Sequence, residues 1–475
     1  MYDRMQTFTT DQMTRIHDAS MDLMSRVGVA FNEPEALDIF TARGFRVEGK
    51  TVYMTESQVR QALDTVPSRF RVRARNPRKS IDVGGDNWVV APGYGAPFIA
   101  LPDGRQSKAT MADYDNFCKL VQTSPTIDMN GFMMVVPDDV SPGTSHLDML
   151  LSGMLLCDKP FMGSPVSRQG ARDCVEMAAI LWGGKDKLAD VGPVSVSLIS
   201  SQSPLQFQGE MAGALIELAR ANQACVIDSL VMAGSSGPVT LSGVLVLQNT
   251  EILAGITLAQ LVNPGVPVIY GGLSSAMDMR TGGLAVGCPE LSMIVSATAQ
   301  IARFYNIPSR SGGSLTDAHF PDAQAAGESA LALSTAVRNG IHFILDSAGI
   351  LGSYMAMSYE KFLVDEEMCA ILRKLTAPID FSDEAIDVEM IKAVGIGGQY
   401  LTQPQTLKRC RTEFHTTDFF NRQNHAAWTA AGSQRIDQAA TQRVRERLAA
   451  YETPVIDPEV DTALRAYVAE HKPSG

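Results

Sequence analysis

Side chains that could transfer protons follow two strand-like apolar runs in the second half of the chain. Asp346 comes directly after the run 341–345, and Asp317 and His319 follow the run 307–311. In a parallel barrel the C-terminal ends of the strands meet at one face, and that face carries the active site. We therefore predict catalytic roles for Asp317, His319 and Asp346. The ordinary alternatives are helix capping by Asp317 and a structural role for His319.

Aromatic side chains near the same strand ends could bind a quaternary ammonium group, because the face of an aromatic ring attracts cations. Tyr94 is the preferred residue, since it lies in the Gly/Pro-rich segment 92–97, which is unlike a regular helix. Tyr270, at the end of another expected strand, is the second choice. The other expected substrate contacts are Phe98, Arg280, Phe343 and Tyr354. The competing interpretation for each aromatic residue is packing in the core.

Metal and nucleotide chemistry is not indicated by the sequence. It has no HExxH or His-x-Cys pattern, so we expect no metal site. No Gly-x-Ser-x-Gly motif predicts a serine hydrolase, and no glycine-rich loop joins a strand to a helix. Instead, the segments after the expected strands are rich in Gly, Ser and Ala, which favours a wide opening that a large flat cofactor or another backbone can approach.

Short apolar runs alternate with helical patterns from about residue 127 onward. The expected strands are 127–136, 159–163, 193–199, 224–231, 267–271, 307–311 and 341–345. The helical patterns between them include 147–156, 171–181, 207–220, 241–262, 289–305 and 322–339. Continuous apolar strands that alternate with helices are typical of a parallel sheet covered on both faces. The predicted fold is therefore an α/β (β/α)8 TIM barrel, with an open doubly wound sheet as the alternative.

Three segments are expected along the chain. Residues 1–125 form an N-terminal helical and β extension, residues 126–405 the catalytic barrel, and residues 406–475 a helical C-terminal tail. The 475 residues carry a formal net charge of -12, which disfavours nucleic acid and anionic membranes as partners. Seven cysteines without a CxxC pair, and a start without the apolar core of a signal peptide, predict a cytoplasmic protein.

Several sequence stretches resemble the trimethylamine methyltransferase family. They are APGYGAP (91–97), DMRTG (278–282), CPEL (288–291), GGSLTDA (312–318) and DAQAAGE (322–328). The similarity runs in order over nearly the whole chain, and residues 278–328 are its most specific part. The trimethylamine enzymes carry a pyrrolysine in the region that corresponds to 312–315, which here holds only ordinary residues. The chain therefore resembles the pyrrolysine-free branch, the glycine betaine methyltransferases.

The resemblance implies a barrel whose mouth receives a corrinoid-binding partner protein. The partner supplies the corrinoid, and no cofactor is expected to bind this chain tightly. The implied reaction moves a methyl group from glycine betaine to the Co(I) of the corrinoid and releases dimethylglycine, and a homo-oligomer is expected. The alternatives are the same reaction on proline betaine or carnitine, a barrel lyase or aldolase that uses the three predicted acid–base residues, and a non-catalytic betaine-binding protein.

Overall fold

A curled parallel sheet forms the centre of the computed structural model, which describes residues 4–418 and 420–472. Its strand order is β6-β18-β17-β14-β12-β10-β9, and every neighbouring pair is parallel. The bounds are β6 (Val89–Val90), β9 (Phe161–Met162), β10 (Ser195–Ser200), β12 (Ala224–Ser229), β14 (Val268–Gly272), β17 (Ser309–Gly312) and β18 (Phe343–Leu345). The last six confirm strands expected from the sequence. β6 lies inside the expected N-terminal extension, so a boundary at 125/126 would cut the central sheet.

The expected strand 127–136 is not continuous: residues 128–130 bridge the two edges of the sheet, and Val135 forms a separate parallel bridge with Ala96. Asp128 N donates to Val90 O at 3.0 Å, so the segment joins the β6 edge of the sheet. Asn130 N donates to Pro160 O at 2.8 Å and Met162 N to Asn130 O at 2.9 Å, which joins the β9 edge. The prediction of one continuous strand was wrong because the chain bends over residues 132–134, between residue 130 and the bridge at Val135.

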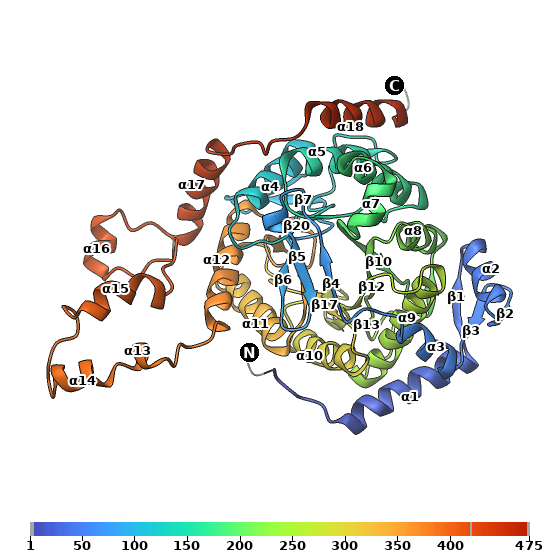
Figure 1. Ribbon diagram of the computed structural model, residues 1–475, viewed down its shortest axis with the longest axis horizontal. Helices are drawn as coiled ribbons and strands as arrows, with labels where there is room; N and C mark the ends of the chain where they lie inside the picture. Colours follow the sequence, from blue (N-terminus) through green and yellow to red (C-terminus); the bar gives the residue numbers. More distant parts are fainter. Residues whose placement is uncertain (1–3, 419, 473–475) are drawn as a thin grey trace.

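Helices surround the sheet on its outer face (Figure 1). They are α4 (Met111–Thr123), α5 (Ser145–Leu156), α6 (Arg168–Trp182), α8 (Gly209–Arg220), α9 (Leu241–Val262), α10 (Pro289–Phe304), α11 (Ala323–Asn339) and α12 (Tyr359–Leu375). By length and composition α9 could cross a membrane, but 78% of its most apolar window is buried inside the protein. It packs against β12, β14 and the N-terminal helix α1 (Thr10–Arg26), and this position makes it a core helix.

An antiparallel hairpin, β4 (Arg69–Val72) and β5 (Ile81–Gly84), covers the end of the sheet at which the strands begin. Arg73 N donates to Pro193 O at 2.9 Å, just before β10, and Asn76 N donates to Asp158 O at 3.1 Å, just before β9. His342, just before β18, contacts Gly85 O at 3.1 Å through Nε2. A site that is open to ligands therefore has to lie at the opposite end of the strands.

The two ends of the chain lie outside the sheet. At the N-terminus, α1, α2 (Pro34–Ala42), α3 (Glu56–Leu63) and a small sheet of order β11-β1-β3-β2 pack beside α8 and α9. Its strands are β1 (Val29–Phe31), β2 (Arg46–Glu48), β3 (Thr51–Tyr53) and β11 (Gln206–Phe207). At the C-terminus, α13 (Asp383–Ile386), α14 (Val388–Val394), α15 (Pro404–Glu413) and α16 (His425–Ala430) project from the body, whereas α17 (Ile436–Ala449) and α18 (Pro458–His471) return to it (Figure 1).

Candidate active site

A buried ionic cluster lies inside the curled sheet, toward the C-terminal ends of its strands. Arg310 on β17 is 1% exposed, and its Nη1 lies 2.8 Å from Asp228 Oδ1 on β12. Its Nη2 lies 3.4 Å from Asp346 Oδ2, directly after β18. Both carboxylates are also buried. Burial of an ion is costly unless it is paired, so three buried ions at one place indicate a site rather than ordinary core packing.

The glycine between the two strands makes the Arg310–Asp228 pair possible. Gly271 of β14 is the register partner of Asp228 on one side and of Arg310 on the other. A Cβ at Gly271 would lie 2.9 Å from Asp228 Oδ1. The absence of a side chain there lets the carboxylate and the guanidinium meet across the middle strand.

The electrostatics of the cluster depend on the ionisation of Asp346. Burial raises the pKa of Asp346 to about 7, against the opposing positive charge of Arg310. Burial also raises the pKa of Asp228, with Arg310 again opposing the shift. When both carboxylates are ionised, the cluster carries one net negative charge, which favours a cationic ligand beside it.

Three polar atoms of this region are buried without a hydrogen-bond partner among the described residues. They are Asp346 Oδ1, Arg310 Nε and the hydroxyl of Tyr354. An unsatisfied buried polar group costs about 1–3 kcal/mol, and more when it is charged. Asp346 Oδ1 can accept a hydrogen bond, Arg310 Nε can donate one, and the Tyr354 hydroxyl can do either. All three atoms are therefore available to a polar ligand.

Two tyrosines lie beside Asp346. Burial raises the pKa of Tyr94 and of Tyr354 above the usual range, and the nearby Asp346 carboxylate raises both further. Tyr94 lies in the loop after β6, where Asp346 N donates to Pro92 O at 3.2 Å. Tyr354 lies in the turn between β19 (Ile350–Leu351) and β20 (Ala356–Met357). The site therefore combines a buried carboxylate with two aromatic side chains that the sequence predicted for it.

The backbone around the site is held in a sparsely populated conformation. Asp346, Ser353 and Tyr354 have φ angles of 58°, 52° and 76°, in the left-handed region that non-glycine residues rarely adopt. Such conformations cost of order 1–3 kcal/mol each and cluster at ligand-binding sites. The strain at these three positions supports the assignment of a functional site.

Asp317 holds the turn that carries Tyr354. Its Oδ1 accepts from Ser353 Oγ at 2.6 Å and from Val286 N at 2.8 Å, and its Oδ2 accepts from Gly287 N at 2.9 Å. Glu328 on α11 in turn accepts from Asp317 N at 2.9 Å. Both carboxylate oxygens of Asp317 are thus engaged in connecting three loops. This geometry favours a positioning role over the predicted role in proton transfer.

Tyr270, the second choice for the ammonium site, faces the surrounding helices. Its hydroxyl donates to Asn249 Oδ1 on α9 at 2.9 Å, and its ring lies 6.3 Å from that of Tyr305. In β14 the neighbours Ile269 and Gly271 face the interior, so the alternation of the strand turns Tyr270 outward. The prediction for Tyr270 was wrong because a position at a strand end does not specify which face a side chain occupies.

The other predicted residues are spread around the same end of the sheet. Phe343 is the register partner of Arg310 and is fully buried in the apolar interior. Phe98, on β7 (Phe98–Ala100), is half-buried in a small apolar cluster with Leu351 and Ala356. His319 is exposed beside Gly352, and Arg280 is exposed in the turn between β15 (Ser275–Met277) and β16 (Leu284–Ala285). Within the part of the chain that the structure describes, none of these four makes a hydrogen bond or ion pair with the ionic cluster.

Arg310 and Asp228 were missed by the sequence analysis, although both lie inside expected strands. A charged residue inside an expected strand of a fully covered sheet is the signal that could have identified them, and it is clearest for Asp228, whose strand 224–231 is otherwise mostly apolar. No group of three or more His, Cys, Asp or Glu side chains suited to a metal ion occurs within residues 4–418 and 420–472. The candidate site is therefore defined as Arg310, Asp228, Asp346, Tyr94 and Tyr354.

Comparison with known proteins identifies relatives over the full length of the chain. The glycine betaine methyltransferase of Desulfitobacterium hafniense (strain Y51) is 46% identical over 97% of this chain and 96% of its own. The proline betaine:corrinoid methyltransferase of Eubacterium limosum is 32% identical and covers 97% of each. The crystal structure of the Methanosarcina barkeri monomethylamine methyltransferase matches 93% of this chain and 88% of its own with a TM-score of 0.50 at 13% identity, which is a likeness of fold. The profile of the trimethylamine methyltransferase family matches residues 1–475, and the chain belongs to that family.

Proposed function

We propose that this methyltransferase moves a methyl group from glycine betaine to the reduced cobalt of a corrinoid protein and releases dimethylglycine. The observation that carries the proposal is the buried cluster of one arginine and two aspartates, with unpartnered polar atoms, beside two tyrosines. Glycine betaine is a zwitterion, with a quaternary ammonium and a carboxylate a few atoms apart. The cluster offers groups for both ends.

The ammonium end fits beside Asp346. The ionised cluster has one net negative charge, and the rings of Tyr94 and Tyr354 offer cation–π attraction of about 0.5–2 kcal/mol each. Because a quaternary ammonium has no N–H group, it is bound by charge and ring faces rather than by hydrogen bonds. The carboxylate end of the substrate then accepts hydrogen bonds from the two unpartnered donors, Arg310 Nε and the Tyr354 hydroxyl.

The chain's part in the reaction is orientation and exclusion of water. The corrinoid, when its protein is docked, supplies a nucleophilic cobalt that accepts the methyl group. The leaving group is a neutral tertiary amine, so no side chain has to donate a proton to it. Asp346, Tyr94 and Tyr354 hold the ammonium in place, and the small-residue loops at the strand ends let the cofactor approach. Asp346 therefore acts as a fixed counter-charge and not as a proton donor.

The corrinoid is proposed to arrive with a separate protein, and no tightly bound cofactor is assigned to this chain. The relative from Eubacterium limosum is named as a betaine:corrinoid methyltransferase, which supports a corrinoid acceptor. The same relative makes proline betaine the second candidate substrate. Both candidates present the same ammonium and carboxylate groups to the site.

The sheet is proposed to be a closed (β/α)8 barrel, with residues 128–130 in the place of the eighth strand. Hydrogen bonds from this segment to β6 and to the residues around β9 support closure of the two sheet edges. Because β6 and β18 are neighbours in the sheet, Asp346 and Tyr94 already lie side by side; closure would bring the loop after β9 to the same opening.

The proposed reaction is tested by mixing the chain with a reduced corrinoid protein and glycine betaine. We expect a change in the corrinoid absorption spectrum and an equal amount of dimethylglycine by mass spectrometry. Proline betaine and trimethylamine are run in parallel. A rate with trimethylamine equal to that with glycine betaine would exclude the quaternary-amine assignment.

A further inference from the structure

Helix α12 carries a second buried ion pair, which lies behind the loops of the candidate site. Lys361 Nζ lies 2.7 Å from Asp365 Oδ2, one helical turn further along. Lys361 is 1% exposed and Asp365 2%. Neither residue belongs to the site defined above. Replacement of a buried ion pair by apolar side chains of similar volume is often neutral for stability, so the stability of the fold does not by itself require these two ions.

The lysine contacts the loop that follows β17. Lys361 Nζ donates to Ser314 O at 2.9 Å and to Ser329 Oγ on α11, also at 2.9 Å. With Asp365 as the third acceptor, all three hydrogens of the ammonium group are used. Ser314 N in turn donates to Asp346 O at 2.9 Å. Lys361 is therefore connected to the backbone of Asp346 through a single residue.

The aspartate contacts the loop that follows β18. Asp365 Oδ2 accepts from Gly349 N at 2.8 Å. Gly349 O accepts from the backbone N–H of Ser358, the N-cap residue of α12, at 2.9 Å. Helix α12 and its N-cap therefore bond both backbone polar groups of this glycine. Together with the lysine, the aspartate fixes both ends of the loop 346–349.

The same loop is bonded to the segment that carries Tyr94. Asp346 N donates to Pro92 O at 3.2 Å. Gly93 N donates to Ala348 O at 2.9 Å. Asp346 has a φ of 58°, and a strained backbone of this kind persists only when surrounding contacts hold it. A displacement of the loop would therefore move the Asp346 carboxylate and the Tyr94 segment together.

We propose that Lys361 and Asp365 are positioning residues for the Asp346 carboxylate. Their hydrogen bonds hold the loop 346–349, and the loop sets where the carboxylate lies. Because the ammonium hydrogens of the lysine are all used inside the protein, the pair does not bind the ligand itself. The inference rests on the proposed function for the identity of the ligand, glycine betaine, whereas the placement of Asp346 beside Arg310 is a property of the free protein.

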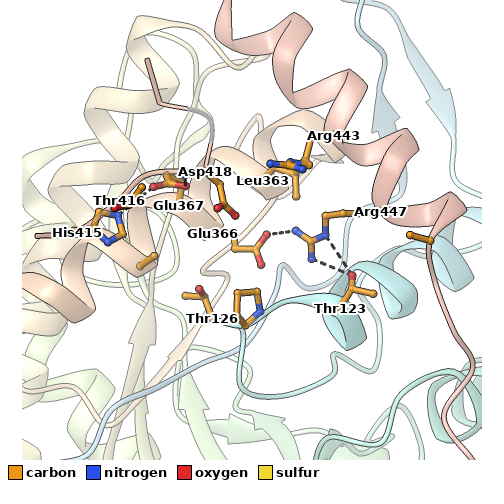
Figure 2. A pocket seen from close by; sticks show the side chains of 13 residues that line it. Thr123, Thr126, Leu363, Glu366, Glu367, His415, Thr416, Asp418, Arg443 and Arg447 are labelled. Carbon is orange, nitrogen blue, oxygen red and sulfur yellow. Dashed lines mark hydrogen bonds and ion pairs between the residues drawn. The ribbon is translucent and has the colours of Figure 1, made fainter. Parts of the chain in front are cut away.

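Another side of α12 provides a matched control, which Figure 2 shows. Glu366 is 7% exposed and is paired with Arg447 of α17. This pair lies in the wall of a polar pocket of about 520 Å³ between α12, α17 and the segment 415–418. Within the part of the chain that the structure describes, it makes no hydrogen bond to Ser314 or to the loop 346–349. The helix thus carries two buried ion pairs, of which one contacts the loops of the site.

The test removes each pair without leaving an unpaired ion. The pair variant is Lys361→Met/Asp365→Leu, and the control variant is Glu366→Leu/Arg447→Met. By calorimetry at pH 8, we expect the pair variant to bind glycine betaine about tenfold more weakly, since small displacements of a positioned group have effects of at least this order. The control variant should bind as the wild type does. Asp365→Asn should retain most of the affinity, because its amide oxygen can still accept from Gly349 N.

A double-mutant cycle separates positioning from a general loosening of the fold. If the pair acts through Asp346, the pair substitutions should weaken binding much less in an Asp346→Asn background than in the wild type. Equal effects in the two backgrounds, or wild-type affinity of the pair variant, overturn the inference. A pair variant without a cooperative unfolding transition also overturns it, because the pair is then needed for the fold itself.

A wild type that does not bind glycine betaine refutes the proposed function, and positioning is then measured without a ligand. In urea unfolding at pH 8, Asp346→Asn should stabilise the wild type and the control variant, because it removes a buried charge. The pair variant should not gain this stability, because the released carboxylate already reaches water. Equal stabilisation in all three backgrounds overturns the inference.

Discussion

Replacement of Asp346 with asparagine removes a buried charge while it keeps the shape of the side chain. Asparagine also tolerates the left-handed backbone, which Asp346 adopts with a φ of 58°. Burial raises the pKa of Asp346 to about 7 in the folded protein, whereas the ordinary value of 3.8 applies to the unfolded chain. A difference of about 3 in pKa corresponds to on the order of 4 kcal/mol of unfavourable free energy when the group is ionised in the folded protein.

The sign of the effect follows from proton binding. Between pH 3.8 and about 7 the folded protein holds a proton that the unfolded chain releases, so the stability of the wild type falls as the pH rises through this window. The full cost is present above pH 7. We expect Asp346→Asn to raise the free energy of unfolding by about 1–4 kcal/mol at pH 8. Near pH 4 the gain should shrink to below about 1 kcal/mol.

The assay is urea unfolding of wild type and Asp346→Asn at pH 4, 6 and 8, together with calorimetric binding of glycine betaine. The same substitution should weaken betaine binding at pH 8, because the cluster loses its net negative charge. In the wild type, binding should strengthen from pH 6 to pH 8 as Asp346 ionises. A stability difference that does not change with pH would refute the assignment of a buried, protonatable Asp346. A variant that binds betaine as the wild type does would refute its role as the counter-charge.

Three further substitutions test the surroundings of the cluster. Tyr94→Ala should weaken betaine binding by about 0.5–2 kcal/mol and Tyr94→Phe by less, since the ring face remains; a large fall in melting temperature with unchanged calorimetric binding would return Tyr94 to the core. Asp317→Ala should raise the KM for betaine and lower stability by about 1–3 kcal/mol, because three hydrogen bonds to neighbouring loops are lost; an unchanged KM in steady-state assays would contradict the positioning role. Gly271→Ala should lower stability by about 1–3 kcal/mol in thermal unfolding, because its Cβ would lie 2.9 Å from Asp228 Oδ1. Its matched control, Gly283→Ala, has only Thr281 Oγ1 at 3.5 Å and should be neutral.

The sequence predicted the strands and helices well where apolar runs are long and continuous. The helix expected at 241–262 has these bounds in the structure, and the six central strands β9, β10, β12, β14, β17 and β18 follow the alternating pattern. The sequence-based prediction failed where a strand is defined by pairing with a distant part of the chain. β6 is only two residues long, and its place in the sheet depends on β18, which lies about 250 residues further along the chain. Periodicity within a segment cannot report such a distant partner.

The site was predictable in part. Asp346 and Tyr94 were identified from their places after strands, and the structure brings these two residues together. Tyr270 shows the limit of that reasoning, because a shift of one residue in a strand reverses the face that a side chain occupies. Arg310 was overlooked because it lies inside the expected strand 307–311, whereas site residues were predicted only from the segments that follow the strands. The hydrogen bonds of Asp317 depend on three loops from different parts of the chain, and no local pattern predicts them.

The hairpin of β4 and β5 has a kinetic consequence. Because it covers the end at which the strands begin, ligands reach Arg310 and Asp346 from the opposite end, which the corrinoid protein must also occupy for methyl transfer under the proposed function. Substrate, product and partner then share one entrance. Glycine betaine has to bind before the corrinoid protein docks, and dimethylglycine leaves only after that protein has dissociated. With this compulsory order, an excess of the corrinoid protein should inhibit the reaction. A corrinoid protein that docks on the substrate-free enzyme blocks the entry of glycine betaine.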